Sequence, residues 1–157
     1  MKTVVAAIAI LLQVLPLLTE ATSSPQSIDP KDIANILGRR YYFSTVPLNV
    51  GEGVTLCLEL NMTLAGFETP EEYDAVTNYV TYTLGRTDIH WTSGARQYTS
   101  WIWTNSGEPF TFFRWDVSEP DITDGAQQQG LAVLNGLMQD QPTVTSYRCI
   151  CEEKTSC

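Results

Sequence analysis

The stretch WDVSEPDITDG, residues 115–125, has the densest set of side chains that could do chemistry. It places four carboxylates around one proline, directly after a run of aromatic residues: Asp116, Glu119, Asp121 and Asp124. Proline and glycine in so polar a stretch predict an irregular loop rather than a helix or strand. Carboxylate oxygens gathered in one loop can bind a cation, but acidic side chains can also serve only to keep a protein in solution.

The charge of the whole chain has the same sign. It carries 18 acidic side chains against 9 lysines and arginines, for a formal net charge of −9. Nucleic acid needs a basic binding face, so we expect no nucleic-acid partner. The acidic excess favours cation binding only weakly, and a surface that merely maintains solubility is an equal alternative.

The first residues have the layout of a cleaved secretory signal. Lys2 precedes an apolar run from Val4 to Leu18, and small polar residues follow Ala21. The run is short for a transmembrane helix, and no later segment is long enough to span a bilayer, so we expect a secreted, extracellular protein that does not insert into membranes. The ranges predicted are a signal peptide at 1–21, an N-terminal arm at 22–38, one domain at 39–153 and a C-terminal tail at 154–157.

Two segments of the domain predict helices. TPEEYDAVTNYVTYT offers Thr69 as N-cap, Pro70 in the first turn and Glu72 in position to complete a capping box. NVGEGVTLCLEL is also predicted to be helical, although Gly51 and Gly53 each cost about 1 kcal/mol in a helix interior.

Strands are predicted on either side of these helices. RRYYFS, from Arg39, has the aromatic composition of a strand, and YRCICEE forms a final strand. From Ile89 onward, aromatic residues and threonines punctuated by turn residues predict short strands and long loops. In the arm, Asp29 can cap one short helical turn that begins at Pro30. The order strand, helix, helix and loop-rich β region predicts an α+β fold.

Four cysteines in a secreted chain should mostly form disulfides: Cys57, Cys149, Cys151 and Cys157. Cys149 and Cys151 stand two residues apart, so on a strand their side chains share one face and cannot easily both take the same distant partner. Zinc is disfavoured because the chain has a single histidine, His90.

Five segments in order resemble the C-type lectin-like domain, particularly the single-domain secreted lectins of arthropods: YYFS, NVGEGVTLCLELNMTLAGFETPEEYDAV, HWTSG, WIWTNSGEPFTFFRWDVSEPD and CICEE. The resemblance covers nearly everything from Tyr41 to Glu152. It implies a double-looped α+β domain in which two helices flank small antiparallel sheets and a long loop region. It also implies that Trp91 and the adjacent His90 are packed residues rather than ligand-binding or catalytic ones.

The resemblance implies one disulfide that closes the domain, from Cys57 at the end of the first helix to Cys151 in the last strand. Closing so long a loop should stabilise the fold by about 4 to 5 kcal/mol. Cys149 and Cys157 could bond to each other, or Cys157 could bridge to a second chain and give a disulfide-linked oligomer. A non-covalent oligomer is a further possibility.

Sugar-binding members of this family hold a calcium ion between a Glu-Pro-Asn or Gln-Pro-Asp loop and a Trp-Asn-Asp motif on a following strand. Residues 119–121, Glu-Pro-Asp, occupy the first position here, and residues 138–140, Met-Gln-Asp, occupy the second. Calcium takes six to eight oxygen ligands, and vicinal sugar hydroxyls complete its shell. The resemblance implies metal ligands at Glu119, Asp121, Gln139 and Asp140, with sugar contacts at Glu119, Asp121 and Asp140.

The sequence departs from the family pattern in ways that change this chemistry. Glu119 with Asp121 offers only acceptors where the family pairs an acceptor with an amide donor, so neither mannose-type nor galactose-type preference follows. Gln139 replaces asparagine and adds a methylene, which moves its carbonyl oxygen and costs rotamer entropy. An intermediate family ligand, a glutamate, is replaced by the neutral Gln128 or Gln129.

The family's inner disulfide, which staples the calcium loop, is also absent. Its places are taken near Leu131 and by Thr143. Losing such a bond should remove about 2 to 4 kcal/mol of support from the loop. We therefore expect a weakened calcium site.

One more segment carries two interpretations. Asn61-Met62-Thr63 is an N-glycosylation sequon in a secreted chain. Asn61 also suits the left-handed conformation that a helix C-terminal cap requires. Both interpretations remain open on sequence grounds.

Two functions fit these residues. The first is a secreted lectin that binds microbial or host glycans, or a glycoprotein, through a degenerate calcium site, with Trp103, Phe113 and Trp115 either stacking on a sugar or, more commonly at this spacing, packing in the core. The second is a calcium-independent domain of the same fold that binds a protein partner or serves in a larger assembly. No enzyme is expected, because a single histidine at a structural position leaves no base for a serine or cysteine nucleophile.

Overall fold

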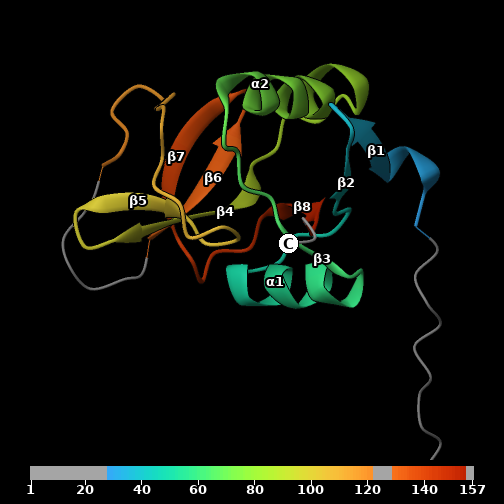
Figure 1. The fold of residues 1–157 in the computed structure, drawn as a ribbon, viewed down its shortest axis with the longest axis horizontal. Helices are drawn as coiled ribbons and strands as arrows, with labels where there is room; N and C mark the ends of the chain where they lie inside the picture. Colours follow the sequence, from blue (N-terminus) through green and yellow to red (C-terminus); the bar gives the residue numbers. More distant parts are fainter. Residues whose placement is uncertain (1–27, 122–128, 155–157) are drawn as a thin grey trace, which may run out of the picture.

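The computed structural model describes residues 28–121 and 129–154 (Figure 1). The predicted signal peptide, Asp124, Gln128 and Cys157 lie outside these residues. The elements are η1 (Pro30–Asp32), β1 (Ile33–Ile36), β2 (Arg39–Phe43), α1 (Val50–Glu59), β3 (Met62–Leu64), α2 (Pro70–Asn78), η2 (Tyr79–Thr83), β4 (His90–Gln97), β5 (Ser100–Trp103), β6 (Gln129–Leu134), β7 (Leu137–Pro142) and β8 (Arg148–Glu153). Within the described ranges, no helix has the length and apolar character that crossing a bilayer would require.

The strands form one connected sheet that brings the two ends of the domain together. Its order is β1-β2-β8-β4-β6-β7, with β3 also pairing with β8 and β5 with β4. The predicted α+β class is confirmed. One pair differs from the antiparallel arrangement expected: β4 and β8 run parallel, with His90 opposite Arg148 and Trp91 opposite Cys149. The last strand lies between β2 and β4, antiparallel to β2 and parallel to β4.

The sheet begins earlier in the chain than the sequence predicts. Residues 33–36, predicted as part of the arm, form β1 and pair antiparallel with β2. Leu37 and Gly38 have φ values of 51° and 83° and form the tight turn between the two strands. Left-handed conformations at both positions suit a two-residue hairpin, but leucine is not a residue that signals one. The helical turn predicted at Pro30 is present, and Asp29 caps it.

Helix α1 forms where it was predicted, despite its glycines. The side chain of Asn49 accepts a hydrogen bond from Glu52 N at 3.0 Å, and Asn49 N donates to the Glu52 carboxylate at 2.9 Å. This capping box satisfies backbone donors at the helix start. Gly53 is buried against β8, where a Cβ would lie 3.5 Å from the Cβ of Cys149.

Helix α2 also begins where it was predicted. Thr69 Oγ1 accepts a hydrogen bond from Glu72 N at 3.2 Å. The Glu72 carboxylate does not complete the expected capping box on Thr69; it accepts from the Tyr41 hydroxyl and pairs with Arg39 at 3.0 Å. Glu72 is therefore used to tie the helix to β2 rather than only to cap it.

The two helices cover opposite faces of the sheet (Figure 1). Alternation along the strands builds a separate cluster on each face. In β2, Tyr41 belongs to the cluster beneath α2 and Tyr42 to the cluster beneath α1. In β8, Ile150 belongs to the first cluster, whereas its neighbours Cys149 and Cys151 belong to the second. Trp91 and His90 are both fully buried, as the resemblance implied.

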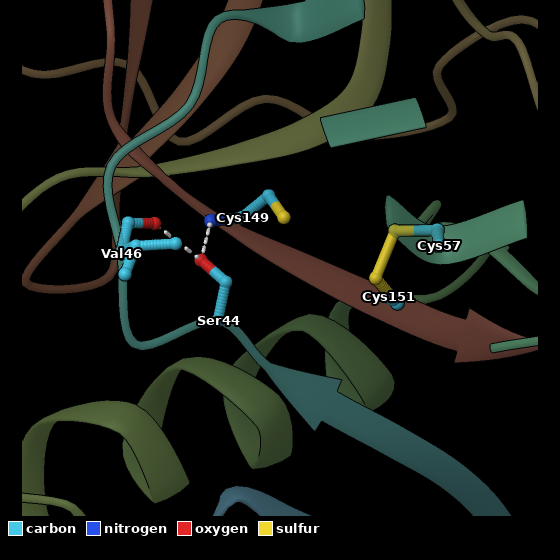
Figure 2. The surroundings of a disulfide bond; sticks show 5 residues. All are labelled: Ser44, Val46, Cys57, Cys149 and Cys151. Atoms are coloured by element: carbon cyan, nitrogen blue, oxygen red, sulfur yellow. Dashed lines mark hydrogen bonds between the residues drawn. A yellow bond between two sulfur atoms is a disulfide. The ribbon is translucent and has the colours of Figure 1, made fainter. Parts of the chain in front are cut away.

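A disulfide joins Cys57 of α1 to Cys151 of β8 (Figure 2). The two cysteines lie 94 residues apart in the chain, and their Cα atoms are 5.5 Å apart. A bond closing a loop of this length contributes about 4 to 5 kcal/mol on the chain-entropy account. Cys149 is buried and bonds to no cysteine that the structure describes. A bond between Cys149 and Cys157 stays a prediction, because Cys157 lies outside the described residues.

Asn61 follows Leu60, the C-cap residue of α1. Its φ is 56°, and its backbone N–H donates to Leu58 O at 2.9 Å. The side chain is exposed. Asn61 therefore has the left-handed conformation that the cap interpretation predicted, and its exposed amide also remains available for glycosylation.

Substitutions at Asn61 and Thr63 separate these two roles. In protein from a non-glycosylating host, we expect Asn61→Ala to lose about 1 kcal/mol of unfolding free energy, because alanine resists the left-handed conformation, while Asn61→Gly stays close to wild type. Denaturant unfolding measures both. An equal loss in the two variants would contradict the cap role.

In secreted protein, we expect wild type to show a mass decrease on endoglycosidase treatment and Thr63→Ala to show none.

Candidate functional site

The acidic loop is held along β7 by backbone hydrogen bonds. Met138 N donates to Arg114 O at 2.7 Å, and Asp116 N donates to Met138 O at 2.9 Å. These bonds form a parallel bridge between Trp115 and Met138. Met138, which stands where the family has tryptophan, is fully buried. The bridge fixes the loop so that Glu119 and Asp121 lie over Asp140, two residues further along β7.

Three carboxylates meet at this point. Each of Glu119, Asp121 and Asp140 offers an oxygen, and these oxygens lie within 4.8 Å of one another. Asp121 N donates to Asp140 Oδ1 at 2.9 Å, and Asp140 N donates to Glu119 Oε2 at 3.3 Å. The Glu119–Pro120 peptide is cis. The structure thus brings together three of the four residues predicted as metal ligands, from a loop and a strand that are distant in sequence.

The electrostatics of this cluster favour a cation. Asp140 is only 3% exposed, and its Oδ2 has no hydrogen-bond partner among the described residues. A buried carboxylate oxygen without a partner is costly. Burial, and then the facing Asp140 carboxyl group, raise the pKa of Glu119 to about 7. Hard oxygen donors, an unpartnered buried oxygen and mutual repulsion fit a calcium ion, which takes carboxylate ligands.

Gln139, the fourth predicted ligand, makes a contact that was not foreseen. Its amide Nε2 donates to Asp116 Oδ2 at 2.9 Å, while Asp116 Oδ1 accepts from Val117 N at 2.7 Å. The side chain, one methylene longer than asparagine, is thereby linked to the first carboxylate of the acidic loop. Gln139 as a calcium ligand stays a prediction. Asp116 was assigned no role of its own from the sequence. Its position in the acidic stretch was the only feature of the sequence that pointed to it.

The remaining positions carried over from the family are neutral. Gln129 begins β6, is nearly buried, and its amide oxygen has no partner among the described residues. Leu131 is fully buried and lies opposite Asp140 in the β6–β7 ladder. Thr143 lies beside Gly130, where a Cβ would be 3.2 Å from its methyl group. The Thr143 methyl group therefore packs close to Gly130, the residue before Leu131.

The three aromatic residues near the loop differ in exposure. Trp103 is 1% exposed and stacks on Phe110 with ring centroids 3.9 Å apart, so it belongs to the core. Trp115 is half-buried and contacts Trp101. Phe113 is 55% exposed, and its ring centroid lies 6.1 Å from that of Trp115. Of the three, Phe113 presents the most surface to a ligand.

His90 is not placed for catalysis. It is fully buried, and its Nδ1 lies 2.8 Å from Asp88 O. Burial lowers the pKa of His90 to about 4, so the ring is neutral at physiological pH. Its position matches the packed role that the resemblance implied.

The comparison with solved structures identifies the architecture. Neither a scan against protein-family models nor a search of the curated proteins finds a match. Among solved structures, the carbohydrate-recognition domain of the mouse scavenger receptor C-type lectin is similar, with a TM-score of 0.67 and 23% identity over 82% of this chain and 98% of that one. The C-type lectin CEL-I from Cucumaria echinata has a TM-score of 0.65 and 18% identity, over 79% of this chain and 96% of that one.

A third similar structure has a different stated role. It is a Ca²⁺-dependent type II antifreeze protein in its Ca²⁺-free form, with a TM-score of 0.64 and 22% identity over 80% of this chain and 99% of that one. Identities of this size establish the fold, which carbohydrate-recognition domains and antifreeze proteins share. This chain has the fold of a C-type lectin-like domain.

Proposed function

We propose that this protein is a secreted lectin that binds carbohydrate with a calcium ion held by Glu119, Asp121 and Asp140. The observation that carries the proposal is the meeting of these three carboxylates within 4.8 Å, with the buried Oδ2 of Asp140 unpartnered among the described residues. Carbohydrate-recognition domains among the similar structures support it. The secretory signal predicted at residues 1–21 supports an extracellular location.

The donor set of the site suggests how a sugar would be held. Calcium bound here would supply coordination positions for two vicinal sugar hydroxyls. Glu119 and Asp121 would accept hydrogen bonds from those hydroxyls, but neither carboxylate can donate one back. The bound glycan would therefore be recognised by the hydrogens of its hydroxyl groups, and its class, microbial or host, would be set by residues around the cluster, such as the exposed Phe113.

One observation favours the second candidate function, a calcium-independent domain that binds a protein partner. The Gln139 amide nitrogen is committed to Asp116, and a neutral residue, Gln128 or Gln129, stands where the family has a glutamate. Fewer anionic ligands mean weaker calcium binding. Sugar binding that persists without calcium, or no sugar binding at all, would favour this second function.

Calorimetry tests the calcium site directly. We expect heat on adding calcium to wild type, and affinity at least about tenfold weaker in Glu119→Gln and Asp140→Asn, because each removes one anionic ligand. Glu71→Gln is the matched control, since Glu71 is exposed on α2. No heat at millimolar calcium, or an unchanged affinity in Asp140→Asn, would contradict the site.

The raised pKa of Glu119 determines whether calcium affinity rises or falls with pH. In the calcium-free protein this pKa is raised to about 7 by burial and by Asp140, so a proton competes with calcium below that pH. We expect calcium affinity to fall as pH drops from 7 toward 5, by up to about tenfold per unit, with proton release on binding. Glu119→Gln should remove most of this dependence.

Conversely, the calcium-free protein should lose stability as pH rises from about 4.5 to 7, because the folded state disfavours the charged form of Glu119.

Asp121→Asn tests whether the absence of an amide hydrogen-bond donor in the Glu-Pro-Asp loop limits carbohydrate binding. The substitution supplies an amide N–H to a sugar hydroxyl oxygen, and one added hydrogen bond is worth about 0.5 to 1.5 kcal/mol. We expect carbohydrate affinity at saturating calcium to rise between about twofold and tenfold, measured with mannose and galactose polymers in parallel. Unchanged or weaker binding to both polymers at full calcium occupancy would show that the donor pattern does not limit recognition.

A further inference from the structure

Three sulfur atoms meet where α1 packs on β8. Cys57 and Cys151 form the disulfide, and the Cys149 Sγ lies within 4.8 Å of both of their sulfurs. Figure 2 shows Cys149 and Cys151 along the same strand, with Cys57 bonded to Cys151. Cys149 bonds to no cysteine in the part of the chain that the structure describes. The Cys149 sulfur, unbonded within the described residues, therefore lies beside the bond that closes the domain.

The geometry of β8 accounts for this arrangement. Alternate side chains of a strand share a face, so Cys149 and Cys151 both point toward α1 while Ile150 points to the opposite core. On α1, Gly53 lies one turn before Cys57, and a Cβ at Gly53 would contact the Cys149 Sγ at 3.6 Å. Without a side chain at position 53, the thiol of Cys149 fits directly against the helix that carries Cys57.

The backbone of Cys149 is held firmly at this place. Its N–H donates to Ser44 Oγ at 2.8 Å, and Ser44 in turn donates to Val46 O at 3.0 Å (Figure 2). Cys149 also pairs with Trp91 across the parallel β4–β8 ladder. The residue is fully buried, and among the described residues the two sulfurs of the disulfide lie within 4.8 Å of its own sulfur.

We propose that Cys149 is a second partner for Cys57, so that the domain can be closed by either of two disulfides, Cys57–Cys151 or Cys57–Cys149. Cys149 loses its proton to water, and its thiolate attacks the Cys57 sulfur. The Cys57–Cys149 bond forms as the Cys57–Cys151 bond breaks, and Cys151 leaves as a thiolate that then takes up a proton. The exchange consumes no oxidant or reductant.

The two bonds are close to equivalent for the unfolded chain. The alternative disulfide closes a loop only two residues shorter than the present separation of 94 residues. Loop length enters the chain-entropy term logarithmically, so this difference is negligible. Packing around β8 decides which bond predominates. Exchange would leave α1 joined to the last strand, and the domain would stay closed.

The environment of Cys149 controls the rate. Burial raises the pKa of the Cys149 thiol to about 11, so the attacking thiolate is scarce at neutral pH. The titratable side chains that share its cluster are Tyr42 of β2 and Tyr147 before β8; Cys57 and Cys151 do not titrate while they are bonded to each other. Exchange is therefore slow at neutral pH and faster as pH rises.

Peptide mapping of the secreted full-length chain tests the proposal. In a Cys157→Ala background, the free thiols are blocked with N-ethylmaleimide in denaturant and the chain is cut with trypsin. Cleavage after Arg40, Arg86, Arg148 and Lys154 places Cys57 on residues 41–86, and both Cys149 and Cys151 on residues 149–154. We expect Cys151→Ala to carry a Cys57–Cys149 bond in most molecules, and the matched Cys149→Ala to keep Cys57–Cys151. A folded Cys151→Ala protein with two blocked thiols would overturn the proposal.

A second measurement covers the case in which Cys151→Ala does not fold. The Cys157→Ala protein is held in native buffer at pH 7 to 10 and quenched in acid, and fragment ions on either side of Ile150 locate the bonded cysteine. We expect the Cys57–Cys149 isomer to appear, with a rate that rises about tenfold per pH unit below the Cys149 pKa. Its absence at pH 10 would overturn the proposal. A Cys149–Cys157 bond found in the secreted wild type would do so as well, because Cys149 would then not be free.

Discussion

The insertion of the last strand between β2 and β4 is the constraint on which the rest of the structure depends. β8 pairs with β2, β3 and β4, and the side chains on its two faces enter both hydrophobic clusters. The Cys57–Cys151 disulfide joins this strand to α1 across nearly the whole domain. With β8 in place, β4 and β6 are positioned, β7 pairs with β6, and β7 offers the edge along which the acidic loop lies. The candidate site, built from residues 119–121 and Asp140, thus depends on β8, although β8 contributes no residue to it.

The acidic loop places the carboxyl group of Glu119 next to a buried carboxylate of β7, Asp140. Because burial disfavours negative charge, this pair favours binding of a proton or a cation. The bridge between Trp115 and Met138 brings Glu119 over Asp140, and Asp140 is buried there with one oxygen unpartnered among the described residues. Proteins seldom keep such a group without a compensating proton or cation. In the calcium-free protein the raised pKa of Glu119 favours its protonated form, and a bound calcium ion would displace that proton. The fold is shared with carbohydrate-recognition domains and an antifreeze protein, so function has to be argued from these side chains.

The sequence predicted those parts of the fold that are marked by a short motif. Thr69 with Pro70, and the family resemblance around Cys57 and Cys151, located α2 and the closing disulfide. It missed β1 because the turn at Leu37 and Gly38 uses a leucine in a left-handed conformation, where a local pattern would require asparagine or aspartate. The parallel pairing of β4 with β8 depends on contacts between segments more than 50 residues apart, for which no local periodicity exists.

The meeting of the three carboxylates was predictable from the sequence, but their hydrogen-bond partners were not. Glu119, Asp121 and Asp140 follow from motif positions, whereas the Gln139–Asp116 hydrogen bond depends on how far one longer side chain reaches. The most direct measurement of the central claim is a crystal structure of the protein grown with calcium. The account predicts an ion with oxygens of Glu119, Asp121 and Asp140 at about 2.3 to 2.6 Å. A water molecule, or a direct contact between the Glu119 and Asp140 carboxyl groups with no ion at millimolar calcium, would contradict it.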